Sequence, residues 1–392
     1  MRLGDCGKTN LHTYSDKEKW SLIRYLDTGS ITEGRIDEIQ TLYPGVDKIP
    51  SRARRKASVG DILFSTVRPN QKHYGIIEAG TENLLVSTGF TVVTVDTTIA
   101  DPYFIYYYLT QSSVIESLQA IAEQSTSTYP SIKPSDIEDI ELDLPELETQ
   151  KKIGSTLRML DRKIALNEEI NDNLEQQAQA IYHERFETVS PNDLPSEWRI
   201  VTLGEVATIS NKSFNPLKEP EILLEHYSIP AFDEARFPVF ELSTSIKSNK
   251  FIIDASCFMI SKLNPTTKRV WKPYCLTGNA VCSTEFIVYK AKDKTITDFL
   301  YSVIDSNSFS DFMCSHVTGS TGSRQRTTPS DTLSYELILP SEDELAEFQS
   351  LVSPMYAQIR INAIENDRLK RLRDSLLPKL MSGEIDVSAV QF

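Results

Sequence analysis

Two patterns of apolar and polar residues alternate along the chain, and each occurs twice. Short β-branched or aromatic runs bounded by Gly, Asp or Lys predict strands, for example at residues 91–95 and 285–289. Apolar residues at alternating steps of four and three predict long helices that begin after Pro145 and Pro340 and end near Phe186 and Met381. Shorter helices are predicted at 103–119 and 297–314. Together these patterns predict an α+β fold, without the alternating strand–helix units of a Rossmann sheet.

The two halves of the chain match one another at a nearly constant offset of 195 to 196 residues. Chance does not easily keep one register over so much sequence, so the match predicts a pseudo-two-fold repeat of a globular domain followed by a long helix. The matched segments are 62–69 with 258–265, 87–90 with 283–286, 134–136 with 329–331, and 144–145 with 339–340.

The long helices are expected to form a coiled coil. About 40 residues at 1.5 Å per residue give roughly 60 Å, far more than an ordinary globular helix. Both carry a heptad seam that two asparagines interrupt at matching places. The seam positions are Ile153, Leu157, Leu160, Ile164, Asn167, Asn171, Leu174, Ala178 and Ile181, and Phe348, Val352, Met355, Ile359, Asn362, Asn366, Leu369, Arg373 and Leu376.

The asparagines predict how the helices pair. Polar residues on a seam lower stability and fix the register. A parallel pairing would also align the asparagines, but an antiparallel pairing is favoured because the chain leaves the first helix, builds a globular domain and returns. The asparagines at 167 and 171 would then face those at 362 and 366 and satisfy their amides. The alternative is a shallow seam with solvated asparagines. Pro354 is expected to kink the second helix, because proline removes an internal hydrogen bond.

The length of 392 residues exceeds what one hydrophobic core supports, since cores stop growing near ~250 to 300 residues. We therefore expect a globular domain at 1–144, a long helix in 145–190, a second globular domain at 191–340 and a second long helix in 341–392. Hydrophobic residues make up 40% of the chain and charged residues 24%, which fits folded domains rather than disorder.

The net charge of −14 taken alone argues against a nucleic-acid partner, and none of the four segments is basic overall. An anion site would have to be a local patch. The five cysteines are odd in number and include no C-x-x-C pair, so neither a disulfide framework nor a zinc ribbon is expected. No apolar run approaches the ~20 residues of a membrane span, and we expect a cytoplasmic protein.

Common catalytic motifs are missing from the sequence. The glycine-rich stretch 318–323 is followed by Arg324-Gln325-Arg326 and not by a phosphate-loop lysine. The five histidines have no metal-ligand spacing, and there is no G-x-S-x-G or H-E-x-x-H motif. We therefore expect no catalytic residue and no metal site on this chain.

Two turn-like segments in each half concentrate cationic and amide side chains. Arg, Lys, Asn and Gln can contact guanine and adenine edges, while Ser, Thr and Lys can contact phosphates. For each residue the alternative is a solvated surface position. The candidates in the first half are Arg52, Arg54, Arg55, Lys56, Arg68, Asn70, Gln71, Lys72, Ser125, Thr126, Thr128 and Tyr129. Those in the second half are Lys262, Asn264, Lys268, Arg269, Lys272, Ser320, Thr321, Ser323, Arg324, Gln325 and Arg326.

The order of several motifs resembles that of the specificity (S) subunit of type I restriction-modification systems. The resemblance covers essentially the whole chain, and it is the order of the motifs, not any single one, that is specific. The motifs are Gly60-Asp61-Ile62-Leu63-Phe64-Ser65 with Arg68-Pro69, Ser261-Lys262-Leu263-Asn264-Pro265, and segments 144–153, 160–164 and 376–385.

The resemblance implies a non-catalytic DNA-binding subunit. Residues 1–144 and 191–340 would be target recognition domains that each bind one half of a bipartite, asymmetric sequence in double-stranded DNA. The long helices would be conserved-region helices that dock two modification (methyltransferase) subunits, with restriction/translocase subunits completing the complex. S-adenosylmethionine, ATP and Mg would bind on those partners and none on this chain. The second helix starts without the Gln-Lys-Lys-Ile of the first, which puts equal docking of the two partners in doubt.

Geometry and composition add two expectations. Two equivalent domains on one face of a duplex should contact half-sites whose centres lie ~10 base pairs apart. Because the candidate contacts differ, as Arg68 does from Asn264 and Gln71 from Thr267, the half-sites should be unlike.

Two other interpretations stay open. One is a coiled-coil scaffold with two protein-binding adaptor domains and no DNA binding, which the net charge favours and the arginine-rich turns oppose. The other is a self-contained modification enzyme, which the absence of a [DNS]-P-P-[YFW] motif opposes. Steep salt dependence of binding would separate the first from DNA recognition, and reaction with S-adenosylmethionine by this chain alone would identify the second.

Overall fold

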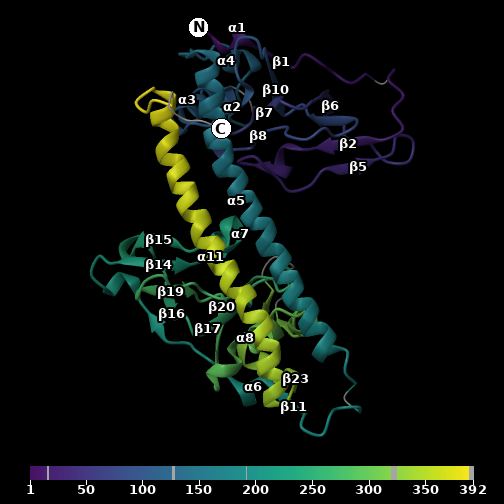
Figure 1. Ribbon diagram of the computed structural model, residues 1–392, viewed down its shortest axis with the longest axis vertical. Coiled ribbons are helices and arrows are strands. Elements are labelled where there is room, and N and C mark those ends of the chain that lie inside the picture. The colour runs from purple at the N-terminus through teal and green to yellow at the C-terminus, as the bar shows by residue number, and fades with distance from the viewer. Residues whose placement is uncertain (16, 126–128, 191, 319–324, 388–392) are drawn as a thin grey trace. The chain divides into compact units, whose positions relative to one another are not determined.

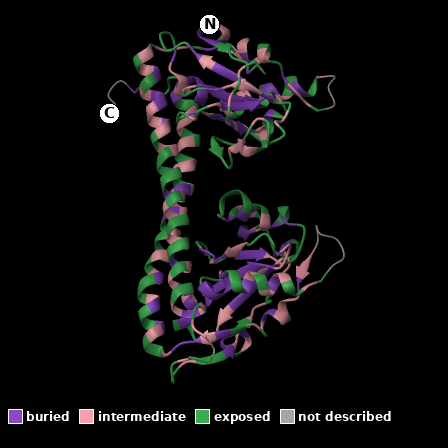
Figure 2. Cartoon of the chain, turned by 90° about the vertical axis from the view of Figure 1, so that its right-hand side faces the viewer, coloured by how far each residue is buried: buried purple, intermediate pink, exposed green. Residues whose placement is uncertain are grey.

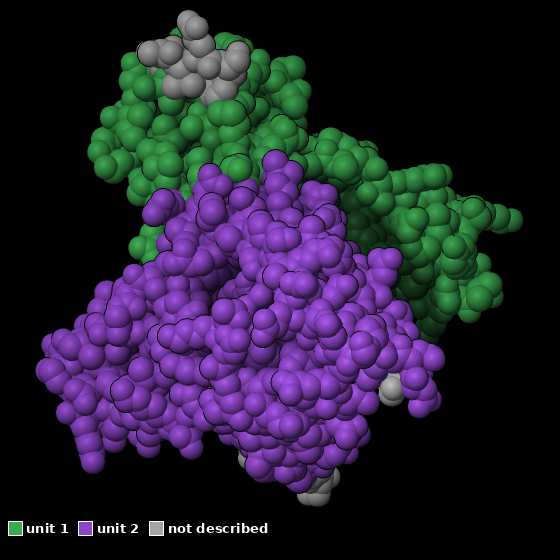
Figure 3. Space-filling model, turned by 60° about the horizontal axis from the view of Figure 1, so that its bottom comes forward, with its two compact units in different colours: residues 1–163, 369–392 green, residues 164–368 purple. Residues whose placement is uncertain are grey.

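The computed structural model describes residues 1–15, 17–125, 129–190, 192–318 and 325–387. It contains two compact units (Figure 3), unit 1 with residues 1–163 and 369–392, and unit 2 with residues 164–368. Each unit holds one of the repeated globular regions together with part of both long helices. The unit boundaries therefore fall inside the two helices.

Unit 1 is built on two four-stranded sheets. The first has the order β1 (Gly7–Thr9), β10 (Phe90–Val95), β7 (Ile62–Ser65), β8 (Tyr74–Ile76), and its neighbours are antiparallel. The second has the order β5 (Gln40–Leu42), β2 (Ile23–Leu26), β9 (Leu84–Ser87), β6 (Ala53–Lys56), with β2 and β9 parallel. A short ribbon pairs β3 (Ile31–Thr32) with β4 (Arg35–Ile36). Every residue of β7 is buried, as its apolar sequence predicts.

The helices of unit 1 cover the first sheet. The predicted single helix at 103–119 is two helices, because the chain turns at Thr110 and Gln111. Asp101 caps the first of them by accepting the Phe104 N–H. The elements are α1 (Leu3–Cys6), α2 (Pro102–Leu109), α3 (Ser112–Glu123), α4 (Pro134–Glu138), and the 3-10 turns η1 (Thr28–Ser30) and η2 (Pro69–Gln71).

Unit 2 repeats this plan. One four-stranded sheet has the order β12 (Ala207–Ile209), β20 (Phe286–Ala291), β17 (Cys257–Ser261), β18 (Val270–Trp271). A five-stranded sheet has the order β13 (Ser213–Phe214), β16 (Lys250–Ile252), β19 (Ala280–Ser283), β14 (Leu223–Tyr227), β15 (Val239–Leu242), with β14 and β19 parallel. Two ribbons pair β11 (Arg199–Thr202) with β23 (Glu336–Leu339) and β21 (Val317–Thr318) with β22 (Arg326–Thr327).

Apart from α7, which has no counterpart in unit 1, the α-helices of unit 2 also follow the repeat. The predicted helix at 297–314 is again two helices, and the Ser306 side chain caps the second by accepting the Phe309 N–H. The elements are α6 (Leu203–Val206), α7 (Ile229–Ala235), α8 (Thr297–Ile304), α9 (Asn307–Ser315), α10 (Pro329–Thr332), and the 3-10 turns η4 (Pro216–Lys218), η5 (Ser243–Ser245) and η6 (Lys294–Ile296).

The long helices are α5 (Leu147–Tyr182), which continues as a π-helical turn η3 (His183–Glu187), and α11 (Glu342–Met381) (Figure 1). The helix of α11 continues through Pro354. Within each unit their apolar faces enter the core of the globular region. Ile153 and Leu157 are buried in unit 1, and Phe348 and Val352 in unit 2. Figure 2 shows the exposed positions that remain along both helices.

The seam asparagines pair across the two helices in unit 2. Asn167 Nδ2 donates to Asn366 Oδ1, and Asn362 Nδ2 donates to Asn171 Oδ1, both at 2.8 Å. Residue numbers thus rise on one helix as they fall on the other, so the helices are antiparallel. Asn366 also donates to the Ile164 carbonyl at 3.3 Å. These contacts satisfy amides that would otherwise be costly to bury.

Candidate nucleic-acid interface

A tight turn follows strand β7 in unit 1. The Ser65 hydroxyl donates to the Val67 carbonyl at 3.0 Å and accepts the Val67 N–H at 3.2 Å. Arg68 then adopts a left-handed conformation with φ of 50°, which non-glycine residues rarely do. Its N–H donates to the Pro130 carbonyl at 3.0 Å, and its guanidinium lies 5.1 Å from the centre of the Tyr129 ring. The turn therefore holds an exposed arginine on a fixed backbone.

The matching turn follows strand β17 in unit 2. The Ser261 hydroxyl donates to the Leu263 carbonyl and accepts the Leu263 N–H, both at 3.2 Å. Asn264 is left-handed with φ of 48°, and its N–H donates to the Gln325 carbonyl at 2.9 Å. The Asn264 Oδ1 atom is buried and has no hydrogen-bond partner among the described residues. The two turns thus share their backbone geometry and differ in their side chains.

The rest of the first turn surrounds Arg68. Asn70 and Gln71 form η2 with Pro69, and the Asn70 N–H donates to the Gln119 side chain at 3.3 Å. Lys72 forms an ion pair with Glu33. Ser125 precedes Tyr129, and its hydroxyl lies 3.3 Å from that of Ser131. Two further predicted residues, Thr126 and Thr128, lie outside the described residues.

Strand β6 carries the arginine-rich segment of unit 1. Arg52 precedes the strand and is exposed, and Arg54, Arg55 and Lys56 lie within it. Lys56 forms an ion pair with Glu18. Arg55 has a buried Nε without a hydrogen-bond partner, and burial lowers the pKa of its guanidinium. An uncompensated, half-buried cation of this kind favours contact with an anion.

Carboxylates hold most of the predicted cations of unit 2. Arg269 donates twice to Asp233, at 2.6 and 2.9 Å, and Arg326 donates twice to Glu285, both at 3.0 Å. Lys272 forms an ion pair with Asp298. Lys262 follows β17 directly, and its N–H donates to the Glu285 carbonyl at 2.9 Å. The predicted residues Ser320, Thr321, Ser323 and Arg324 lie outside the described part of the chain.

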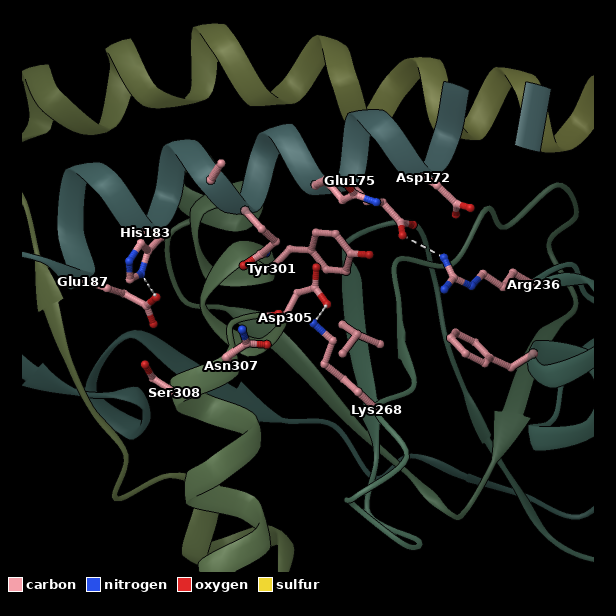
Figure 4. A pocket seen from close by; sticks show the side chains of 15 residues that line it. Asp172, Glu175, His183, Glu187, Arg236, Lys268, Tyr301, Asp305, Asn307 and Ser308 are labelled. Carbon is pink, nitrogen blue, oxygen red and sulfur yellow. Dashed lines mark hydrogen bonds and ion pairs between the residues drawn. The ribbon is translucent and has the colours of Figure 1, made fainter. Parts of the chain in front are cut away.

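Lys268 lies in a polar cavity of about 550 Å³ beside α5 (Figure 4). Its ammonium is 3.0 Å from Asp305, and Arg236 donates to Glu175 across the cavity at 2.7 Å. Burial raises the pKa of both carboxyl groups although a cation lies beside each. The cavity is therefore lined by internally paired charges, and Lys268 is committed to one of these pairs.

Ion pairing divides the predicted cations into two groups. A cation that a carboxylate already neutralises must lose that partner before it contributes fully to phosphate binding. The paired group comprises Lys56, Lys72, Lys268, Arg269, Lys272 and Arg326. The group for which the described residues provide no ion pair comprises Arg52, Arg55, Arg68 and Lys262.

Sequence reasoning missed the carboxylates of these pairs. Each lies between 26 and 41 residues from its cation along the chain. No helical or strand periodicity links positions so far apart, and only the pairing of strands and the packing of helices bring them together. The carboxylates are Glu18, Glu33, Asp233, Glu285, Asp298 and Asp305.

Within the described ranges, no group of three or more His, Cys, Asp or Glu side chains is arranged to hold a metal ion. The five cysteines are unpaired, and three of them are buried. No helix of the described residues is both long and apolar enough to cross a bilayer.

The chain is similar to known proteins of one family. Residues 53–176 match the type I restriction modification DNA specificity domain. The chain is 24% identical to the type I restriction enzyme HindI specificity subunit of Haemophilus influenzae over 98% of both chains. It is also 24% identical to the MjaIX specificity subunit of Methanocaldococcus jannaschii, over 84% of this chain and 78% of that one.

A solved structure shares the fold. The S subunit of a type I restriction-modification system from M. genitalium aligns with a TM-score of 0.57 at 16% identity, over 97% of this chain and 95% of that one. Its resemblance covers both globular regions and both long helices. Together, the matched domain and the relatives aligned over almost their full length support a type I restriction-modification specificity subunit, and the chain shares the fold of a solved S subunit.

Proposed function

We propose that residues 1–144 and 191–340 are target recognition domains that bind the two unlike halves of a bipartite DNA target. The observation that carries the proposal is the duplicated turn, which presents Arg68 in one unit and Asn264 in the other on the same backbone. A repeated fold with different side chains at the matched positions suits two half-sites of different sequence. The chain itself would be non-catalytic.

The partners follow from the same proposal. The segments 145–190 and 341–392 would dock two modification (methyltransferase) subunits, and restriction/translocase subunits would complete the complex. S-adenosylmethionine, ATP and Mg would bind on those subunits. Each long helix also carries exposed apolar residues that a docked subunit would cover. They are Met159, Leu166, Leu351, Ile361 and Leu372.

The test is co-expression with the candidate methyltransferase, followed by sequencing of adenine methylation in the host DNA. We expect one bipartite motif in which two unlike half-sites flank a spacer of fixed length. Methylation at no site would contradict the proposal and favour a protein-binding scaffold.

A second measurement tests the phosphate contacts of the assembled complex. Arg55→Ala should lower the slope of log binding constant against log salt by about 1, because one phosphate contact is lost. Arg35→Ala is the matched control, since Arg35 is exposed, pairs with Asp37 and lies outside the predicted interface. Equal slopes in all three proteins would remove Arg55 from the interface.

A further inference from the structure

We propose that Arg68 and Asn264 are equivalent base-recognising positions, and that Arg68 contacts a guanine in one half-site while Asn264 contacts an adenine in the other. The inference rests on the proposed DNA-recognition function. It goes further by assigning the determinant of one base in each half-site.

The backbone around the two residues is the same bond by bond. The N–H groups of Thr66 and Lys262, two residues earlier, donate to the carbonyls of Gly89 and Glu285 at 2.8 and 2.9 Å. Gly89 and Glu285 are themselves matched positions of the repeat. The turn is thus fixed to the neighbouring strand connection in the same way in both units.

The hydrogen bonds on the other side of the turn match as well. The carbonyls of Thr66 and Lys262 accept from Ile132 and Thr327, at 2.9 and 3.1 Å. The Arg68 carbonyl accepts from Gln71 at 2.8 Å, and the Asn264 carbonyl accepts from Thr267 at 2.9 Å. Each of these backbone hydrogen bonds therefore has a counterpart in the other unit, although the side chains of the two turns differ.

The left-handed conformation is a cost that both turns carry. Glycine would adopt it without strain, yet neither position is glycine, and in both the next residue is a proline that restricts the backbone further. Strained backbone of this kind persists where the surrounding structure holds it, and it clusters at functional sites. Asparagine tolerates this conformation better than arginine, so the strain at Arg68 in particular favours a use of its side chain that glycine cannot supply.

The chemistry of the two side chains identifies the bases. Arg68 is exposed and has no carboxylate partner in the described residues, and the Tyr129 ring orients its guanidinium. A planar guanidinium donates two hydrogen bonds to the O6 and N7 atoms of guanine. It is therefore available to the major groove without first breaking an ion pair.

Asn264 offers one donor and one acceptor, the pair that matches the N7 atom and N6 amino group of adenine. Its Oδ1 lacks a donor in the described residues. Because Oδ1 is buried in the free protein, the Asn264 side chain would have to reorient so that Oδ1 accepts from the adenine N6 amino group while Nδ2 donates to N7. Pairing with adenine would thus satisfy an acceptor that the free protein leaves without a partner.

The test selects DNA targets from a randomised library with the complex of this chain and its methyltransferase partner. Arg68→Gly and Asn264→Gly remove the side chain and also relieve the left-handed strain, so folding is retained. We expect Arg68→Gly to lose a preference of about 5- to 150-fold for one guanine, and Asn264→Gly an equal preference for one adenine in the other half-site. All other positions should keep their preference.

The exchange variants Arg68→Asn and Asn264→Arg sharpen the test. Each should convert the base selected at its position, from guanine to adenine and from adenine to guanine. Arg35→Ala and Asn249→Ala are the controls, because each removes an exposed side chain of the same type that is not part of residues 66–71 or 262–267.

Three outcomes are distinguishable. Loss or conversion at one position per half-site supports the inference. A bipartite motif that every variant leaves unchanged overturns the inference while the proposed function stands. If the unaltered complex selects no sequence at all, the proposed function fails and the inference with it.

Discussion

The two units attach their globular regions to the long helices at matched positions but with different chemistry. In unit 1 the Tyr107 hydroxyl of α2 donates to Asp161 of α5 at 2.6 Å. In unit 2 the matched positions are Ser302 of α8 and Tyr356 of α11, whose hydroxyl oxygens lie 2.7 Å apart. The tyrosine has changed places between the short helix and the long helix, and the hydrogen bond remains.

The exchange changes what surrounds each bond. The Asp161 carboxylate needs a cation, and Arg373 of α11 donates to it at 2.8 Å. Burial opposes the charge of Arg373, but Asp161 beside it raises the pKa of the guanidinium. The position matched to Arg373 is the fully buried Ala178, which lies in the aromatic core of unit 2. The repeat therefore preserves where the parts touch, while one contact is ionic and the other apolar.

The largest loss of stability is expected when the apolar attachment in unit 2 is disrupted. Phe348 is fully buried and packs 5.2 Å from the Phe186 ring, so Phe348→Ala should lower the free energy of unfolding of unit 2 by about 3–5 kcal/mol. Urea unfolding followed by circular dichroism and tryptophan fluorescence measures it. Ile361→Ala, on the exposed face of the same helix, is the control and should change stability by less than about 0.5 kcal/mol. Equal losses in both variants would contradict a core role for Phe348.

The second largest loss of stability is expected when the ionic attachment in unit 1 is disrupted. Arg373→Ala leaves the half-buried Asp161 without its cation and should destabilise unit 1 by about 2–3 kcal/mol, less than a fully buried pair because both side chains keep some exposure. The triple variant Tyr107→Ser, Asp161→Tyr, Arg373→Ala copies the chemistry of unit 2. It should recover part of that loss in the same urea experiment. A triple variant less stable than Arg373→Ala would show that the two attachments are not interchangeable.

A smaller loss of stability is expected when either tyrosine hydroxyl group of the two attachments is removed. Tyr107→Phe removes a hydrogen bond to a charged carboxylate and should cost about 1.5–3 kcal/mol. Tyr356→Phe removes a bond between two neutral hydroxyls and should cost about 0.5–1.5 kcal/mol. Thermal unfolding of the two variants beside the unaltered chain gives the order. The reverse order would mean that Arg373 alone satisfies Asp161.

The periodicity of apolar residues predicted which face of each long helix packs against the other. The heptad seam determined which residues meet, so the asparagines of α5 could be expected opposite those of α11. The same reasoning joined 103–119 into one helix, because its apolar pattern continues across the turn at Thr110 and Gln111. Local patterns thus predict which face of a helix is buried more reliably than they predict where the helix ends.

The candidate site was less predictable, because it depends on contacts between distant segments. Residue types alone indicated Arg68 and Arg269 equally as DNA contacts. Only the structure shows that Asp233 holds Arg269 by two hydrogen bonds while Arg68 lies over an aromatic ring. The left-handed backbone at Arg68 and Asn264 has no signal in a single sequence, since neither residue is the glycine that usually marks it.

The smallest expected difference between the units is in pH dependence. Burial raises the pKa of Glu175 and Asp305 in unit 2, whereas the matched positions in unit 1 are Lys370 and Thr110 and carry no carboxyl group. A carboxyl whose pKa is higher in the folded than in the unfolded state binds its proton more tightly when folded. Its contribution therefore stabilises the folded state of unit 2 at low pH. The contribution is lost as the pH rises through the pKa of the folded state.

Glu175→Gln should remove part of this dependence. We expect the free energy of unfolding of unit 2 to fall less steeply in the variant than in the unaltered chain as the pH rises above the ordinary carboxyl pKa of 4.5. Urea unfolding of both proteins at a series of pH values measures the two slopes. Identical slopes would show that the Arg236 guanidinium, 2.7 Å from Glu175, compensates its burial in full.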